Sequence, residues 1–176
     1  MKTITLLALA FVTQAGDVAA QQAPGDANNP ATKRVAFAQH CFWTGEMKLG
    51  QIEGVVRTEA GFFNGREVTL VEYAPERLAL KDLARLAKQA GVADAVHLDP
   101  GSSASLAGIT AGQPLDESYR TAPASDQKKQ IQGTRFARLQ LSAGQATKVN
   151  AFARQNPGKA LEWLTPVQRE QIKGAN

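Results

Sequence analysis

Short apolar runs broken by turn residues predict alternating strands and helices in the first two thirds of the chain. Strands are expected where β-branched and aromatic residues are frequent, at 35–38, 55–63, 67–73 and 92–98. Helices are expected where apolar residues recur at helical spacing before a glycine, at 42–52 and 80–90. Asn64-Gly65 is the strongest short hairpin signal, so it is expected to join the second strand to the third.

The remainder of the chain has weaker patterns. Residues 102–123 are rich in Gly, Ser, Ala and Pro and are expected to be mostly loop, with a helical turn or two at 104–109. Residues 126–132 have a polar helical pattern. Ser142 with Gln145, and Thr165 before Pro166, are typical helix starts. Two or three short helices are therefore expected to pack onto the main domain through apolar side chains, namely Phe152, Leu161, Trp163, Leu164 and Ile172.

The first twenty of the 176 residues differ from the rest. Lys2 precedes an apolar run at 4–12, and small residues precede Gln21, as in a secretory signal. The run is too short to cross a bilayer, so no membrane attachment is expected after cleavage. The expected divisions are a signal peptide at 1–20, a flexible tether at 21–33, one domain at 34–131, and a helical extension at 132–176 that packs on it. A periplasmic or secreted location follows from the signal.

Composition and charge limit the classes of molecule that the protein is expected to bind. The apolar fraction of 43% and charged fraction of 20% are typical of a globular protein, and the formal net charge is +4. Basic residues alternate with acids instead of clustering beside aromatic residues, so nucleic acid is not an expected partner.

Cys41, the single cysteine, lies between the first predicted strand and the first predicted helix. Unpaired amides at a helix start favour a negatively charged thiolate, which makes Cys41 a candidate nucleophile. The alternative is a buried cysteine that packs as a small hydrophobic residue. A lone cysteine cannot form an intramolecular disulfide, so in an oxidising compartment it is inert, bonded to another molecule, or reactive.

Glu67 has two interpretations as well. In the predicted strand it shares a face with Val71 and Tyr73, so its carboxylate faces a pocket or is an ordinary exposed strand-end group. His40, Cys41 and His97 do not have the number or spacing of ligands that a metal site requires. No metal or other cofactor is expected.

Three segments, in order, carry a resemblance to a known family. The first contains Cys41-Phe42-Trp43 and Glu46 and continues through 54–61; the second is 67–75 (EVTLVEYAP); the third is 118–122 (SYRTA) followed by 126–129 (DQKK). They resemble the GCFW motif, the "PGV…GY" segment, the glutamate six residues before a "YDP" tyrosine, and the "QYRSA…QK" segment of the A-type methionine sulfoxide reductases. The resemblance covers about 35–131.

This resemblance implies an α+β fold with a ferredoxin-like type of mixed sheet and helices on one side, to which the C-terminal residues add a short helical extension. It also implies a peptide-methionine (S)-S-oxide reductase that acts on oxidised methionine in proteins or peptides. Cys41 would attack the sulfoxide sulfur, Glu67 would protonate the departing oxygen, and Tyr119 would hydrogen-bond that oxygen. Phe42 and Trp43 would hold the methyl group of the substrate.

The sequence differs from the motifs of the family at several positions of the same active site. His40 replaces the glycine before the cysteine, and Phe62 stands where the family has a pocket tyrosine. Asp116 is the nearest counterpart of a pocket aspartate, although out of register, and the loop before Glu67 is shortened to a turn. With no second cysteine, the sulfenic acid on Cys41 would need an external, thioredoxin-like thiol. The alternative function is a non-catalytic exported binding module that keeps the reductase fold.

Overall fold

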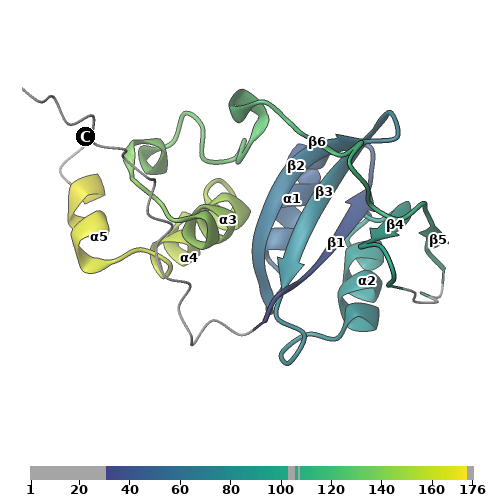
Figure 1. Ribbon diagram of the computed structural model, residues 1–176. Helices are drawn as coiled ribbons and strands as arrows, with labels where there is room; N and C mark the ends of the chain where they lie inside the picture. The colour runs from purple at the N-terminus through teal and green to yellow at the C-terminus, as the bar shows by residue number, and fades with distance from the viewer. Residues whose placement is uncertain (1–30, 103–105, 107, 174–176) are drawn as a thin grey trace, which may run out of the picture.

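The computed structural model of the protein describes residues 31–102, 106 and 108–173 (Figure 1). The predicted signal peptide, and all of the predicted tether but its last residues, lie outside this part of the chain. The principal elements follow one another as β1 (Lys33–Ala38), α1 (Phe42–Gly50), β2 (Val55–Phe63), β3 (Arg66–Tyr73), α2 (Leu80–Gln89) and β4 (Ala95–Leu98). Each predicted strand and helix of this region is present, and its ends differ from the predicted ends by at most three residues.

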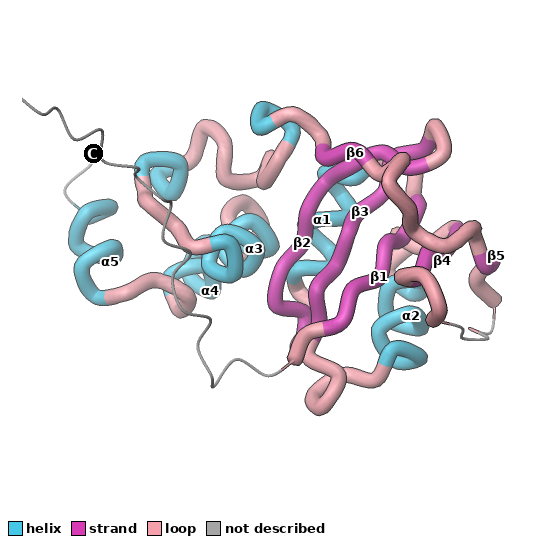
Figure 2. Tube along the Cα trace, in the orientation of Figure 1, coloured by secondary structure: helices cyan, strands magenta, loops and turns pink. Residues whose placement is uncertain are grey.

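The strands form one mixed sheet in the order β5-β4-β1-β3-β2-β6. Within its centre, β1 pairs antiparallel with both β3 and β4, and β2 pairs antiparallel with β3. Leu49 of α1 and Leu83 of α2 belong to one buried cluster with Val35 and Val71 of the sheet, so both helices cover the same face (Figure 2). The fold is α+β with a ferredoxin-like order of elements, which confirms the expected fold class.

The β2–β3 hairpin turns at the predicted dipeptide. Asn64 and Gly65 have φ angles of 49° and 71°, the positive values that a type I′ turn requires. Its register places Phe62 directly opposite Glu67.

The segment after β4 is mostly loop, as expected, and adds two short strands to the sheet. β5 (Thr110–Ala111) pairs parallel with β4, and β6 (Arg120–Thr121) pairs antiparallel with β2. Most of the helical turn expected at 104–109 lies outside the described residues.

The prediction of a helix at 126–132 is wrong. A 3₁₀ turn at Ala124–Asp126 is followed by an extended Gln127 and by Lys128 with a φ of 49°. The side-chain amide of Gln127 pairs with the backbone of Ala60 in β2, accepting from its N–H at 3.0 Å and donating to its C=O at 2.8 Å. These bonds to β2 hold Gln127 extended, and the residues after it form turns instead of the helix that their local pattern predicts.

The C-terminal region contains η2 (Arg135–Arg138), α3 (Ala143–Phe152), α4 (Pro157–Leu161) and α5 (Pro166–Lys173). Both predicted helix starts are confirmed: Ser142 and Gln145 form a capping box, and Gln168 exchanges hydrogen bonds with Thr165. The helices bury a cluster of their own that includes Phe152, Leu164 and Ile172.

Contact with the sheet domain comes chiefly through α3, which packs against α1 and β2. The hydroxyl of Thr147 accepts from the Thr58 N–H at 3.0 Å, and Lys148 Nζ donates to the Gly50 and Ile52 carbonyls at 2.8 and 3.0 Å. The expectation that the listed apolar side chains pack directly on the domain is therefore wrong for most of them. Phe152, Leu161, Leu164 and Ile172 belong to the cluster of the C-terminal helices, which Ile131 of the domain also joins. Trp163 lies outside this cluster and is 42% exposed. No helix within the described ranges is long and apolar enough to cross a membrane.

Candidate functional site

Cys41 is the residue that joins strand to helix. β1 ends at Ala38 and α1 begins at Phe42, with Cys41 as the N-cap in an extended conformation (φ −144°, ψ 113°). The Gly45 N–H donates to the Cys41 carbonyl at 3.0 Å, which is the first bond of the helix. The thiol is half-buried, so neither complete burial nor full exposure describes it.

Glu67 faces the start of this helix. Its Oε2 accepts a hydrogen bond of 2.8 Å from the backbone N–H of Phe42, the residue after Cys41. A carboxylate is well placed there, because the first amides of a helix are unpaired and carry partial positive charge. Of the two interpretations of Glu67, the structure therefore supports the one in which the carboxylate faces into a site.

Aromatic rings lie next to these two groups. Phe42 is buried and meets Phe62 edge to face at 5.3 Å between ring centroids, and Trp43 lies 6.3 Å from Phe42. Phe62 is 39% exposed, although it is a large apolar residue. Cys41, Glu67 and the rings of Phe42, Trp43 and Phe62 thus form one group, which we call the Cys41 site.

Two residues that sequence reasoning did not assign hold α1 in place. A Cβ at Gly45 would lie 2.3 Å from Thr69 Oγ1, so only glycine lets the helix lie this close to β3. Glu46 is fully buried, accepts from the Lys128 N–H at 2.7 Å and forms an ion pair with Lys128 Nζ. Phe42, Gly45, Glu46 and Leu49 form a buried stripe at helical spacing, and this pattern could have indicated that Glu46 faces inward.

Lys129 and Trp43 extend the site on one side. Lys129 Nζ lies 4.6 Å from the centroid of the Trp43 ring, a cation–π contact. The Trp43 Nε1–H is buried and has no hydrogen-bond partner within the described part of the chain. Lys129 lies in the third of the segments that carry the resemblance, but the sequence assigned it no role at the site, and no local pattern pairs it with a tryptophan 86 positions earlier.

Asp116 and the histidines lie outside this group. Asp116 is exposed and accepts from the Ser118 N–H at 2.7 Å; the hydrogen bonds from Ser118 lower the pKa of its carboxyl. His40 is exposed, and His97 is buried elsewhere, against Phe63 and the Gln113 carbonyl. Across the described residues, no three His, Cys, Asp or Glu side chains lie together as a metal site would require.

Tyr119 lies on the opposite face of the sheet. Its ring packs over the bare backbone of Gly61, where a Cβ would come within 2.5 Å of the tyrosine oxygen. Its hydroxyl donates to Glu59 Oε1 at 2.9 Å, and Glu59 also accepts from Arg57 at 2.7 Å. The structure does not bring Tyr119 to Cys41, because strand alternation places Gly61 and Glu59 on the face away from α1.

Replacing Tyr119 by phenylalanine is expected to alter stability in a pH-dependent way. Burial, and then the hydrogen bond to Glu59, raise the pKa of Tyr119 above its usual value of 10.0. A raised folded-state pKa contributes stability that is present below pH 10 and is lost as the pH rises above it. The variant should therefore lose about 1 kcal/mol at pH 7 through the missing hydrogen bond, and should lose less stability than wild type between pH 10 and 11.

Urea unfolding at pH 7, 10 and 11 measures both effects. Tyr73, whose pKa burial also raises, is present in both proteins and so does not affect the difference between them. Identical changes with pH in the two proteins would show that Tyr119 is not buried against Glu59.

Comparison with known proteins finds similarity to a curated relative and to solved structures, while no family model matches the chain. The curated relative is the peptide methionine sulfoxide reductase MsrA of Clostridium perfringens (strain SM101 / Type A). The alignment is 37% identical over 68 residues, and the match covers 29% of this chain and 43% of that protein. The chain therefore matches less than half of this relative's length. One of the solved structures, methionine sulfoxide reductase A of Corynebacterium diphtheriae, is 17% identical with a TM-score of 0.48, over 60% of this chain and 77% of that one. The three sequence segments and the curated match agree, and over part of its length the chain is similar to the MsrA peptide methionine sulfoxide reductases.

Proposed function

We propose that the protein reduces the S epimer of methionine sulfoxide in peptides or proteins. The proposal depends on one observation: the Glu67 carboxylate binds the backbone N–H of Phe42, the residue next to Cys41, at the start of α1. The relation to MsrA supports the same chemistry. The apolar rings of Phe42, Trp43 and Phe62 beside these groups suit a methyl group or another apolar part of the substrate.

In the proposed reaction, Cys41 Sγ attacks the sulfoxide sulfur. Oε2 of Glu67 is held by the Phe42 amide, which leaves Oε1 to carry the proton that the sulfoxide oxygen needs in order to depart. The protonated oxygen is then transferred from the substrate sulfur to Sγ, so that the S–O bond of the substrate and the newly formed Sγ–S bond both break. Methionine is released as the sulfide, and Cys41 is left as a sulfenic acid.

An external thiol must complete the cycle, because the chain has one cysteine. One thiol condenses with the sulfenic acid to form a mixed disulfide and water, and a second thiol releases Cys41 and leaves as a disulfide. Residues 1–20 have the pattern of a secretory signal, so we propose that this exchange takes place outside the cytoplasm, with a thioredoxin-like partner.

A single-turnover experiment without reductant tests the function directly. Each epimer of a methionine sulfoxide peptide is mixed separately with excess protein, and peptide and protein are analysed by mass spectrometry. We expect conversion of the S epimer alone, with one oxygen atom added to Cys41 for each sulfide formed. Absence of sulfide from both epimers, even with a small dithiol present, would rule out the reductase.

Glu67→Gln is expected to lower kcat/KM for the S epimer by about 100-fold. Glutamine keeps an oxygen that can accept from the Phe42 amide, so the helix start is preserved while the acid is lost. Glu72→Gln is the matched control, since Glu72 lies on the opposite face of the same strand and pairs with Arg57 at 3.3 Å. Its kcat/KM should stay within about twofold of wild type. Equal effects of the two substitutions would contradict the role of Glu67.

A second candidate function is a non-catalytic binding module. It is favoured by Phe62, which has no hydroxyl, and by Tyr119, whose hydroxyl is bound to Glu59 on the other face. Saturable binding of the sulfoxide peptide without turnover, together with a Cys41 that resists alkylation in the folded protein, would establish this function instead.

A further inference from the structure

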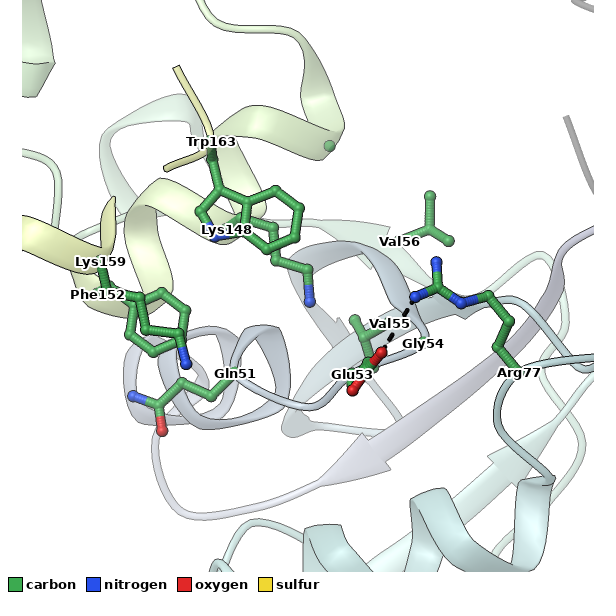
Figure 3. Close-up of a pocket in the computed structure, with 11 residues that line it drawn as sticks. Gln51, Glu53, Gly54, Val55, Val56, Arg77, Lys148, Phe152, Lys159 and Trp163 are labelled. Carbon is green, nitrogen blue, oxygen red and sulfur yellow. Dashed lines mark hydrogen bonds and ion pairs between the residues drawn. The ribbon is translucent and has the colours of Figure 1, made fainter. Parts of the chain in front are cut away.

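A pocket of about 420 Å³ lies between the C-terminal helices and the end of α1. One side is formed by the turn 51–54 and the start of β2, and the other by side chains of α3, α4 and the residues after α4 (Figure 3). This volume is within the range of pockets that hold small organic ligands. We call it the extension pocket.

Three cations from separate parts of the chain line this pocket. Lys148 belongs to α3, Lys159 to α4, and Arg77 to the loop before α2; in the view of Figure 3 the Lys148 ammonium lies between the Lys159 ammonium, beside Gln51, and the Arg77 guanidinium, beside Glu53. Glu53 is the single carboxylate among the lining residues, and its contact with Arg77 at 3.2 Å joins side chains that are 90% and 61% exposed. So exposed a pair is weak, which leaves Arg77 available to another anion.

Lys148 is the most confined of the three. Two of its N–H groups are taken by the Gly50 and Ile52 carbonyls, and one remains. Burial, followed by the positive charge of Arg77, lowers the pKa of Lys148 to about 8, and Lys159 acts in the same direction. Arg77 and Lys159 thus each repel the charge of Lys148, while Glu53 acts against them, and a bound anion would relieve the repulsion on Lys148.

Aromatic rings form the apolar part of the pocket. Trp163 lies against Lys148, whose Nζ is 5.5 Å from the ring centroid, and Phe152 lies against Lys159 at 4.6 Å. Trp163 is 42% exposed despite its size, although it stands among helices that bury other apolar side chains. A flat apolar ligand would cover the exposed part of this ring.

We propose that the extension pocket binds a small organic acid with a flat apolar body. The carboxylate is placed among Lys148, Arg77 and Lys159, and the apolar body lies against Trp163 and Phe152. Charge-assisted hydrogen bonds fix the anion, and the rings remove the apolar surface from water.

This site is separate from the Cys41 site. Cys41 caps the N-terminus of α1, and Gln51 of the pocket caps its C-terminus. Nine helical residues at about 1.5 Å each place the two sites roughly 14 Å apart along the helix. The proposal therefore does not depend on the proposed reductase activity.

Calorimetric titration of the full chain with phenylacetate at pH 7 tests the proposal. We expect saturable binding with a Kd of about 1 mM or below, and binding of the neutral phenylacetamide at least about tenfold weaker. Arg77→Gln and Lys159→Gln, both at exposed positions, should each weaken phenylacetate binding by about three- to tenfold, and Trp163→Ala by about tenfold.

Two variants serve as controls. Lys173→Gln removes an exposed lysine that pairs with Glu170 in α5, outside this pocket, and Cys41→Ser changes the other site. Both should bind phenylacetate as wild type does. Equal affinity for acid and amide, no saturation up to about 10 mM, or an equal loss in Lys173→Gln and Lys159→Gln would overturn the proposal.

Discussion

A Cys41→Ser variant is expected to reduce no methionine sulfoxide above the background of the free reductant, a loss of at least about a thousandfold relative to wild type. A serine hydroxyl is a much weaker nucleophile than a thiolate, and it cannot be converted to a sulfenic acid that thiols then reduce. Turnover of each epimer, measured with a small dithiol in excess, gives the result.

The substitution is well suited to this test because it should not harm the fold. Cys41 occupies the N-cap of α1 and makes no side-chain capping bond, whereas serine is among the preferred N-cap residues. The thermal midpoint of the variant should therefore equal or slightly exceed that of wild type. Residual turnover above about 1% in a correctly folded variant would exclude Cys41 as the nucleophile.

Glu46→Ala is expected to lower the free energy of unfolding by about 3–5 kcal/mol. The carboxylate is fully buried and holds both the backbone N–H and the ammonium of Lys128, whose side chain is 18% exposed. Removing it leaves a largely buried cation without its charge partner, which costs more than the loss of a surface pair. Urea unfolding at pH 7 measures the change.

Two comparisons make the Glu46 result interpretable. Glu53→Ala removes an acid that pairs with Arg77 at the surface, so its effect should be below about 1 kcal/mol. A double variant with Glu46→Leu and Lys128→Met removes both charges and should regain part of the loss, but not all, because the Lys128 N–H still lacks an acceptor. A loss below about 1 kcal/mol in Glu46→Ala would show that the pair is hydrated.

Local signals in the sequence predicted most of the elements. The hairpin at Asn64-Gly65 and the helix starts at Ser142 and Thr165 depend on residues a few positions apart, so their chemistry can be read without the fold. The helix expected at 126–132 failed because distant partners decided its conformation. Gln127 binds Ala60 of β2, and no pattern within its own segment reports that bond.

The candidate site follows the same division. The place of Cys41 between strand and helix could be predicted, since it depends on where two adjacent patterns change. Glu67 could be assigned a strand face, and by the resemblance a place in the site of Cys41, but not its bond to the Phe42 amide. That Tyr119 lies on the face of the sheet away from Cys41 could not be predicted, because it depends on which face of β2 the loop after β4 crosses.

The side chains that contact β2 also determine what can join the sheet. Along its outer edge, the N–H and C=O groups of Thr58 and Ala60 are bonded to Thr147, Lys128 and Gln127. An open strand edge offers such groups to a strand of another molecule and so promotes aggregation. In this protein the backbone groups of Thr58 and Ala60 are not free to bind a strand of another molecule. They are already bonded to side chains of the same polypeptide, which lie up to 89 positions later in the sequence. Thr147 of the C-terminal region, together with Gln127 and Lys128 before it, thereby keeps this edge of the sheet from pairing with other copies of the protein.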